Sequence, residues 1–475
     1  MLRSTRGVAL ITLAMLNVLT LAAGVVLARM LPPRLALLKA VQVAALPEAG
    51  ASAALGTAAG GPMPTSSGLG SALSSLLSSP ALGSGVAAVV ADASGKIVYS
   101  LDGSEMTAPA STEKVATAIA ALDVLGPGDR FRTRVVSGAG SSIVLVGGGD
   151  PTLAAGPAPS SDYPQPATLK DLAAQTAGAL KAQHRRRVEL GYDTSLYTGP
   201  GMAPGWPGSY VTRGDVTQIT SLEVDQGRLT PSGAPEDADD PVNFRPRSAA
   251  PVSVAVSAFE GFLTSDGIRV DGTPSPGTAP ARATVVGSVS SPALPAMVEW
   301  MMTESNNVIA ENLARHVAIA MGDPASFAGA AAAETAVLRR IGAGPEMQLV
   351  DGSGLSPKDQ IAPDTLIRLL TIAASPQHPT LRPAITGLPV AGFSGTLSAG
   401  QSVFGGIGGP ARGVVRAKTG NLTTVAALAG FAYDSDGRLL EFVFNAAHIP
   451  KPAALQTAAN TINDAAAALA SCGCR

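Results

Sequence analysis

A serine and a lysine stand three residues apart at the start of a segment with helical periodicity. Ser111 and Lys114 occur in Pro-Ala-Ser-Thr-Glu-Lys, and the apolar residues after them recur at three- and four-residue spacing. In a helix this spacing places both side chains on one face. A serine hydroxyl is a weak nucleophile unless a base removes its proton, and a neutral lysine is such a base. Alone, the pair is more simply a helix cap and a solvated lysine.

Length and charge limit the classes of protein that fit. The chain has 475 residues, which exceeds the length that a single hydrophobic core usually supports, so we expect two or more domains. Its formal net charge is -2, only 14% of its residues are charged, and it has no basic block. These values exclude the electrostatic footprint of a nucleic-acid-binding protein. We therefore expect no nucleic acid among its partners.

No sequence pattern indicates a metal or a cofactor. The four histidines are scattered, without the spacing of a zinc-binding helix. The glycine triplet 147–149 resembles a phosphate-binding loop, but Asp150-Pro151 follows it in place of the lysine and hydroxyl residue that such a loop requires. A tight turn is the better interpretation of this triplet. We expect no cofactor.

The first 82 residues resemble an export signal followed by a linker. Arg3 and Arg6 precede a long apolar run, which predicts a signal anchor or signal peptide over residues 1–30. Residues 31–82 are rich in alanine, glycine, serine and proline and predict a flexible tether. We therefore expect an extracytoplasmic protein of the cell envelope or periplasmic space, membrane-anchored or secreted. Cleavage of the signal is left open.

The two cysteines lie in the terminal segment 471–475. Cys472 and Cys474 are too few for a disulfide framework or a zinc site. A body without cysteine is compatible with export, because nothing inside it can mispair in an oxidising compartment. Free thiols, a local bridge and a bridge between chains all remain open.

The rest of the chain divides into two parts. Residues 83–131 and 288–470 contain a predicted hairpin, several helical runs, a three-strand antiparallel meander from about 414 to 445 and a final amphipathic helix. Residues 132–287 show short strands, short helices and Pro/Gly turns. The pattern predicts one domain interrupted by a mainly β accessory module of about one domain's size.

Two further short motifs follow Ser111 and Lys114 along the chain. Ser305-Asn306-Asn307 falls at a junction between two helical runs, and Lys418-Thr419-Gly420 ends a predicted strand. Taken alone, each motif is equally well explained by a structural role, as a helix cap or as the end of a strand. All three in this order, each in the expected structural context, are the set found in penicillin-binding proteins and serine β-lactamases.

Longer segments extend this similarity. The chain resembles the class C low-molecular-mass penicillin-binding proteins, the DacB-type D-alanyl-D-alanine carboxypeptidases and endopeptidases, over roughly residues 83–469. The resemblance rests on the three motifs and on Leu145–Leu153 and Asp351–Ser356. It implies an α/β (α+β) fold of the β-lactamase/transpeptidase type, with an antiparallel sheet flanked by helices and inserted domains between the first two motifs.

The resemblance also implies roles for the first two motifs. Ser111 would be the nucleophile that attacks a peptide carbonyl, and Lys114 the general base, kept neutral by burial and by the charge of Lys418. Ser305 would relay a proton to the leaving amine. Asn307 would hold the substrate amide.

The third motif would bind substrate. Lys418 and Thr419 would offer a cation and a hydroxyl to a terminal carboxylate, and Gly420 would leave room for an extended substrate along the strand. The backbone N–H groups of Ser111 and Asn421 would form the oxyanion hole. Related proteins often have threonine at the position of Asn421, whose side-chain contact with substrate would therefore differ.

The implied activity is that of a serine-type D-Ala-D-Ala carboxypeptidase, with endopeptidase activity left open. It would trim peptidoglycan stem peptides through an acyl-enzyme on Ser111 and be acylated there by β-lactam antibiotics. One alternative is a serine β-lactamase, which would need a carboxylate to activate water; Glu189, Glu223 and Glu260 lie in the right interval but in no recognisable motif. The other is a catalytically decayed penicillin-binding or scaffold protein.

Overall fold

The computed structural model describes residues 61–157, 163–229, 245–398 and 407–475. The predicted signal segment 1–30 and most of the predicted tether 31–82 lie outside the described residues. Among the described residues, no helix has both the length and the apolar character needed to cross a membrane.

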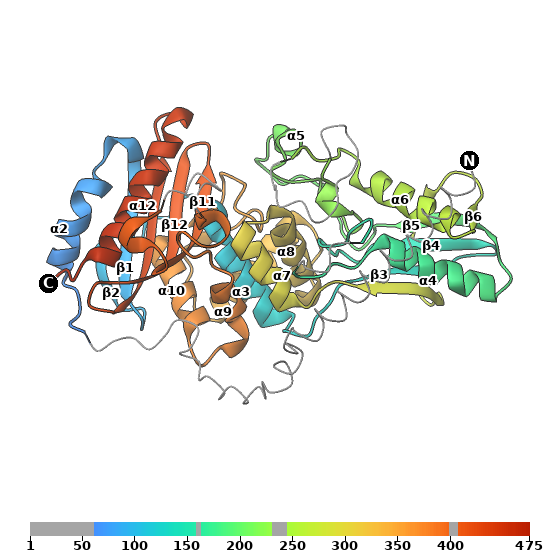
Figure 1. The fold of residues 1–475 in the computed structure, drawn as a ribbon, viewed down its shortest axis with the longest axis horizontal. Coiled ribbons are helices and arrows are strands. Elements are labelled where there is room, and N and C mark those ends of the chain that lie inside the picture. Colours follow the sequence, from blue (N-terminus) through green and yellow to red (C-terminus); the bar gives the residue numbers. More distant parts are fainter. Residues whose placement is uncertain (1–60, 158–162, 230–244, 399–406) are drawn as a thin grey trace, which may run out of the picture. The chain divides into compact units, whose positions relative to one another are not determined.

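A five-stranded antiparallel sheet is the centre of the larger part of the chain (Figure 1). Its order is β11-β12-β13-β1-β2, so the predicted N-terminal hairpin and C-terminal meander lie side by side, joined where β13 pairs with β1. The strands are β1 (Ser84–Asp92), β2 (Ile97–Leu101), β11 (Val415–Leu422), β12 (Val425–Tyr433) and β13 (Leu439–His448).

Helices cover both faces of this sheet, because apolar residues point to both sides of its strands. On β13, Val443 faces one core while Phe442 and Phe444 face the other. The first core is closed by α3 (Lys114–Val124), α7 (Leu294–Glu304), α8 (Asn307–Met321), α9 (Phe327–Arg340) and α10 (Pro363–Ala374). The second is closed by α2 (Ser66–Leu77) and α12 (Leu455–Ser471), seen together on one face in Figure 1. The predicted fold class is confirmed.

Helix α2 corrects the prediction that residues 31–82 are all tether. Serines and glycines occupy its outer side, but Leu69, Leu73 and Leu77 recur on one face and are buried in the second core. The Thr65 side chain caps the helix by accepting the Gly68 N–H at 3.0 Å. Low charge and small residues therefore hid a helix whose few leucines all point inward.

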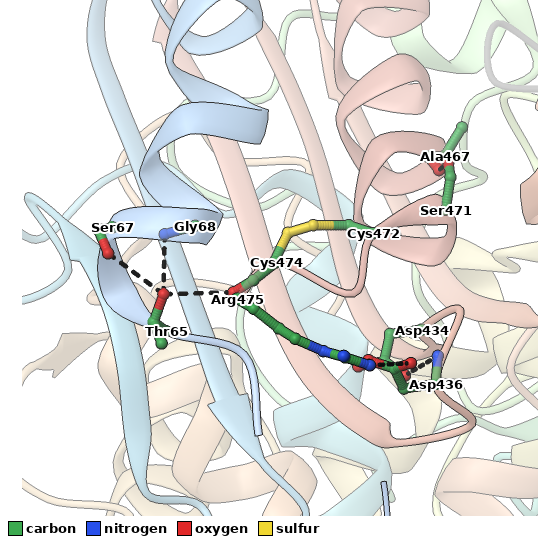
Figure 2. The surroundings of a disulfide bond; sticks show 10 residues. All are labelled: Thr65, Ser67, Gly68, Asp434, Asp436, Ala467, Ser471, Cys472, Cys474 and Arg475. Carbon is green, nitrogen blue, oxygen red and sulfur yellow. Dashed lines mark hydrogen bonds and ion pairs between the residues drawn. A yellow bond between two sulfur atoms is a disulfide. The ribbon is translucent and has the colours of Figure 1, made fainter. Parts of the chain in front are cut away.

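The C-terminal tail packs against the start of α2. Cys472 and Cys474 form a local disulfide, which resolves the three possibilities that the sequence left open (Figure 2). The Cys474 carbonyl accepts the Thr65 N–H at 2.8 Å, and a Cβ on Gly68 would approach that oxygen to 2.1 Å. Arg475 pairs with Asp436 at 2.8 Å. The two ends of the described chain thus meet on one side of the sheet.

A second sheet lies between residues 132 and 290. It has six strands in the order β6-β5-β4-β3-β8, with β7 also paired to β5. The pairs β3–β4 and β3–β8 are antiparallel, whereas β5 pairs in parallel with β4, β6 and β7. The strands are β3 (Arg132–Ser137), β4 (Ser142–Val146), β5 (Arg187–Asp193), β6 (Arg269–Val270), β7 (Ser275–Pro276) and β8 (Val285–Ser290).

This second part is mixed α/β, where the sequence analysis expected it to be mainly β. Helices α4 (Leu169–Ala182) and α6 (Pro251–Ser265) pack on the sheet and share its core, which includes Leu172, Leu190 and Phe259. The parallel strand pairs require such crossover helices. The alanine- and serine-rich sequence of both helices masked their periodicity. The expected boundaries, 132–287, and independent folding of this part stay a prediction.

The chain leaves and re-enters the first part at one place. Phe131 and Ser291 are joined there by two hydrogen bonds: Ser291 N donates to Phe131 O at 2.9 Å, and Phe131 N donates to Ser291 Oγ at 2.9 Å. The remaining short elements are α5 (Ser209–Arg213), β9 (Met347–Gln348), β10 (Gln360–Ile361) and α11 (Pro383–Thr386).

The burial of α2 makes a prediction about stability. Replacing Leu73, which is fully buried, with alanine removes apolar contacts and leaves a cavity, so we expect a loss of about 2–5 kcal/mol in the free energy of unfolding. Ser74→Ala, on the exposed side of the same helix, is the control. Urea denaturation measures both. If L73A were as stable as S74A, α2 would not be part of the core.

Candidate active site

Ser111 lies in a single 3-10 turn, Ala110–Glu113, directly before α3. Ala110 has φ of 48°, a left-handed conformation that is unusual for a residue with a side chain. Gly354 packs on this turn so closely that a Cβ there would lie 2.0 Å from the Ala110 carbonyl oxygen. The nucleophile candidate is therefore presented by a tightly held, strained turn at the start of a helix, as predicted.

Lys114 is the first residue of α3, and its side chain makes three polar contacts. Its Nζ lies 2.8 Å from Ser111 Oγ, 2.6 Å from Asn307 Oδ1 and 2.6 Å from the carbonyl oxygen of Ser353. The lysine is fully buried. Two of the three partners are oxygens that only accept hydrogen bonds, whereas the serine hydroxyl can also donate.

This difference orients the amine when it is neutral. A neutral lysine has two N–H bonds and one lone pair. The amide oxygen of Asn307 and the carbonyl of Ser353 take the two N–H bonds, which leaves the lone pair directed at the hydroxyl of Ser111. These contacts therefore leave a neutral Lys114 able to accept a hydrogen bond from the serine hydroxyl.

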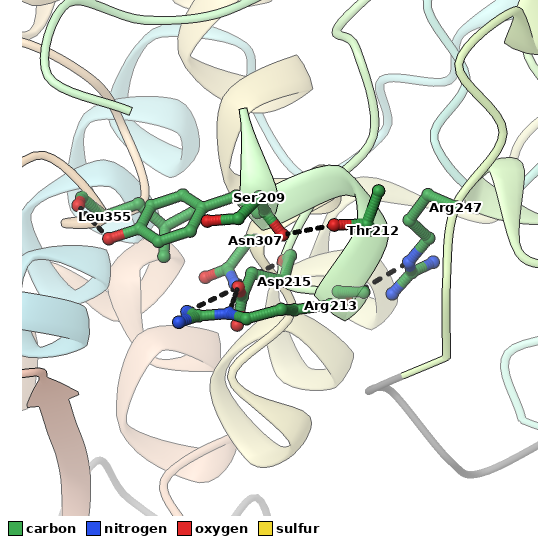
Figure 3. Close-up of polar contacts among 9 residues, drawn as sticks. Ser209, Thr212, Arg213, Asp215, Arg247, Asn307 and Leu355 are labelled. Carbon is green, nitrogen blue, oxygen red and sulfur yellow. Dashed lines mark hydrogen bonds and ion pairs between the residues drawn. The ribbon is translucent and has the colours of Figure 1, made fainter. Parts of the chain in front are cut away.

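Asn307 is itself fixed by the second part of the chain (Figure 3). Its Nδ2 donates to the carbonyl oxygen of Asp215 at 2.8 Å, so its Oδ1 faces Lys114. The neighbouring Asn306 caps α8 through Ile309 N at 3.0 Å and donates to Gln226 Oε1 at 2.8 Å. Both asparagines of the motif thus contact residues between 132 and 287.

Ser305 and Lys418 form a second pair. Ser305 lies between α7 and α8 with φ of 56°, at the predicted helix junction. Lys418 is fully buried in β11, and its Nζ lies 2.8 Å from Ser305 Oγ. Thr419, also on β11, shares a 2.8 Å hydrogen bond with Thr396. The structure therefore brings the members of the three motifs together as two serine–lysine pairs.

Burial sets the charge of both lysines. It lowers the pKa of Lys114 to about 8, although the nearby carboxylates of Asp351, Glu311 and Glu113 act in the opposite direction. Burial also lowers the pKa of Lys418, well below its usual value, and the charge of Lys114 lowers it further. The low pKa of Lys114 therefore follows mainly from burial, and the charges of the two lysines oppose each other.

Gly420 is required by the approach of β11 to the serine turn. A Cβ on this residue would lie 2.8 Å from the Pro109 carbonyl oxygen and 3.1 Å from Thr112 N. The sequence predicts that this glycine leaves room for the substrate, and the close approach of β11 to the serine turn is a further steric reason for a glycine here. Because β11 passes directly beside the turn, the N–H groups of Asn421 and Ser111 lie in adjoining segments, and their role as an oxyanion hole stays a prediction.

A cavity of about 280 Å³ opens beside Asn421. Arg213 and Asp215, from α5 and the residue after its cap, line one side as a 2.7 Å ion pair (Figure 3). Tyr210 and Leu355 line it as well. Apolar side chains anchor this segment to the helical part, because Trp206 and Tyr210 pack with Val308 and Phe327. The cavity therefore adjoins the end of the third motif and offers both charges to a ligand.

The sequence indicates no catalytic role for the Asp351–Ser356 loop. In the structure, this loop supports the site through its hydrogen bonds. The two oxygens of Asp351 accept four N–H groups, from Ser353, Gly354, Ser356 and the Trp206 indole, at 2.6–2.9 Å. This binding shapes the loop so that the Ser353 carbonyl reaches Lys114.

Glu113, Asp351 and Asp359 are buried close enough together to share a metal ion, as judged among the described residues. The oxygens of Asp351 are already occupied by four N–H groups, which leaves little capacity for a metal. Burial raises the pKa of Glu113 well above its usual value and that of Asp359 to about 10, with the charge of neighbouring acids adding to both. These shifts favour the protonated forms of Glu113 and Asp359.

The glutamates considered for β-lactamase chemistry lie elsewhere. Glu223 accepts from Asn312 Nδ2 at 3.3 Å, and Glu189 is on the exposed side of β5. Glu260 lies in α6, on the second part of the chain. In the described parts of the chain, none of the three has a hydrogen bond to Ser111 or Lys114.

Sequence reasoning missed the groups that act through their backbone. The carbonyl oxygens of Ser353 and Asp215 fix Lys114 and Asn307, and backbone contacts leave no trace in residue type. Gln226 was also missed. For Ser353 the sequence offered one signal, because the dense Asp-Gly-Ser-Gly-Leu-Ser run predicts a tightly hydrogen-bonded loop.

Comparison with known proteins identifies the family. The D-Ala-D-Ala carboxypeptidase 3 (S13) family matches residues 69–249 and 232–469. The carboxypeptidase DacB of Mycolicibacterium smegmatis is 36% identical over 417 residues, which cover 87% of this chain and 86% of that protein. The D-alanyl-D-alanine carboxypeptidase of Actinomadura sp. strain R39 is 30% identical over an alignment of 483 residues with gaps, which covers 86% of this chain and 86% of that protein.

The fold has a solved counterpart. Penicillin-binding protein 4 (dacB) of Haemophilus influenzae matches with a TM-score of 0.67 at 23% identity, over 83% of this chain and 98% of that one. This match confirms the predicted β-lactamase/transpeptidase-type fold. By sequence match, motif order and fold, the chain belongs to the D-Ala-D-Ala carboxypeptidase 3 (S13) family of serine peptidases.

Proposed function

We propose that the protein removes the terminal D-alanine from peptidoglycan stem peptides through an acyl-enzyme on Ser111. The observation that carries this proposal is the contact of Ser111 Oγ with Lys114 Nζ at 2.8 Å, with the other bonds of the amine already taken. The substrate class is that named for the relatives in the same family.

Acylation begins when Ser111 Oγ attacks the carbonyl carbon between the two D-alanines. The serine proton moves to the lone pair of Lys114, and the carbonyl oxygen becomes an oxyanion beside the N–H groups of Ser111 and Asn421. The leaving D-alanine nitrogen takes this proton from Lys114 through the hydroxyl of Ser305, which lies 2.8 Å from Lys418 Nζ. The C–N bond then breaks and leaves an ester on Ser111.

The protonation state of Lys418 depends on whether the terminal carboxylate of the substrate is bound. Because Lys418 is buried and its pKa is low, the free site favours its neutral form. An arriving carboxylate favours the ammonium form, and that positive charge in turn opposes protonation of Lys114. Recognition of the carboxylate and readiness of the base are therefore coupled. We expect the Thr419 hydroxyl to bind the same carboxylate.

Hydrolysis of the acyl-enzyme uses the same base. Water takes the place of the departed D-alanine and gives a proton to Lys114 while it attacks the ester. The bond between the acyl carbon and Ser111 Oγ then breaks, and the serine oxygen takes the proton back from Lys114. Among the described residues, none of the three glutamates in the interval where a β-lactamase carries its water-activating carboxylate has a hydrogen bond to Ser111 or Lys114. This favours a peptidase that β-lactams acylate over a β-lactamase that hydrolyses them. The intact pairs of serine and lysine argue equally against a decayed site.

The proposed substrate requires a location outside the cytoplasm. The Arg3/Arg6 flank and the apolar run within residues 1–30 support export or anchoring in the membrane. Whether the enzyme also cuts cross-links as an endopeptidase depends on how much peptide the cavity beside Asn421 accepts.

The first test is the Ser111→Ala variant. Wild-type protein is expected to bind fluorescent penicillin covalently and to release D-alanine from a peptide ending in D-Ala-D-Ala, whereas S111A does neither, because the ester cannot form. Ser137→Ala, a partly buried serine at the end of β3 and outside the site, is the matched control. Equal labelling and release by S111A and wild type would refute the proposal.

The second test is the pH dependence of acylation. Only neutral Lys114 accepts the proton, and its pKa is about 8. The rate of penicillin acylation should therefore fall as pH drops through 8, by about tenfold per unit well below that value. Stopped-flow labelling between pH 6 and 9 measures the profile. A rate that is constant over this range would show that Lys114 is not the base.

The third test concerns Gly420. A methyl group here would press on the carbonyl of Pro109 and displace the serine turn from β11. We expect Gly420→Ala to lower kcat/KM for D-alanine release by at least about 100-fold, since misplacement by about 1 Å costs that much. The control is Gly128→Ala, because open space surrounds the methyl group added there. Normal activity of G420A would contradict the close approach.

A further inference from the structure

A groove separate from the serine site is lined by three arginines. It has a volume of about 730 Å³ and lies where the second sheet meets the ends of α3 and α8. We call it the arginine groove and define it by Arg130, Arg132, Arg134, Phe131, Asp193 and Ile319. No residue of the three catalytic motifs lines it.

The arginines are directed to one surface. Arg132 and Arg134 are exposed and alternate along β3, so both lie on the same face of the strand, about 6.7 Å apart along it. In the described parts of the chain, neither side chain makes a hydrogen bond or an ion pair with another residue. Arg130 donates one hydrogen bond to the carbonyl oxygen of Ser291 at 2.7 Å. Two guanidinium groups are thus available side by side.

The groove also has apolar and acidic walls. Phe131 stacks on His316 at 3.5 Å between ring centroids, and Ile319 and Leu196 are more than a third exposed. Burial lowers the pKa of His316 to about 4, so this ring adds no charge. Asp129 contributes an exposed carboxylate, and Asp193 adds a buried one whose oxygens accept the N–H groups of Ser195 and Ala279 at 2.8 and 2.7 Å. The groove therefore carries three positive and two negative groups around an apolar floor.

This mixture of charges selects among anionic ligands. Guanidinium groups bind carboxylates and phosphates through paired hydrogen bonds. A polymer with a phosphate in every repeat would meet Asp129 and Asp193 with like charge. A peptide with separate carboxylates, amide N–H groups and an amine can use both kinds of wall, and its aliphatic parts fit the apolar floor.

We propose that the arginine groove binds a second, non-reacting peptide of the wall polymer through its free carboxylates. This inference rests on the proposed function for the identity of the polymer. The groove would hold polymeric substrate at a place distinct from the serine, and so would favour reaction on assembled wall over reaction on short peptides.

A direct binding experiment tests this. The probe is a fluorescent disaccharide-tripeptide from peptidoglycan that lacks both terminal D-alanines, and the protein is the full chain with Ser111 first acylated by penicillin G. We expect the probe to bind the acylated protein, and Arg132→Gln/Arg134→Gln to weaken binding about tenfold or more. The matched control, Arg186→Gln/Arg282→Gln, removes two exposed arginines outside the groove and should change binding less than about twofold.

Three results would overturn the proposal: equal binding by R132Q/R134Q and wild type, loss of binding on acylation, or tighter arginine-dependent binding of soluble poly(glycerol phosphate) than of the peptide. Release of D-alanine from a short soluble peptide should be unchanged in R132Q/R134Q, which shows that the variant is folded. Failure of the two proposals can be told apart. Wild type that releases D-alanine but does not bind the probe refutes only the groove, and arginine-dependent binding without D-alanine release refutes only the catalytic proposal.

Discussion

The burial of Lys114 is the constraint on which the rest of the site depends. Its amine lies fully inside the protein with Ser111, Asn307 and Ser353 as partners, and each partner comes from a different part of the chain. A loss of any one acceptor would let the amine turn its lone pair away from the serine. Three segments therefore fix the position of this one nitrogen atom: the strained turn at Ala110, the junction between α7 and α8 that carries Asn307, and the Asp351 loop.

The part of the chain between 132 and 287 belongs to this arrangement. It supplies the Asp215 carbonyl that orients Asn307, and Gln226, which holds Asn306. Trp206 from the same part donates to Asp351 at 2.6 Å, beneath the loop that carries Ser353. Two of the three partners of Lys114 are thus set indirectly by this part. This part therefore helps to position the partners of Lys114 and also lines the cavity beside Asn421.

Residue type predicted the chemistry better than the architecture. The motifs at 111, 305 and 418 and their helix-start, junction and strand contexts follow from the side chains that the reaction needs and from hydrophobic periodicity. Helix α2, the α4 and α6 helices and the parallel strand pairs did not follow, because alanine- and serine-rich helices have weak periodicity and strand pairing depends on contacts distant in sequence. The contact of the Asp215 carbonyl could not be predicted, since every residue has a carbonyl group, and for Ser353 the sequence indicated only a tightly hydrogen-bonded loop.

The buried lysine also sets a cost in stability. The pKa of Lys114 is about 8 in the folded chain, against 10.5 for an exposed lysine. Between these values the unfolded chain holds more protons than the folded one, so the free energy of unfolding rises with pH across that window. Below pH 8 the full cost is present, about 3 kcal/mol at about 1.36 kcal/mol for each pKa unit. Above the exposed value it vanishes. The burial that lowers the pKa of Lys114 therefore also weakens the fold, and two apolar cores on either side of the sheet offset that loss.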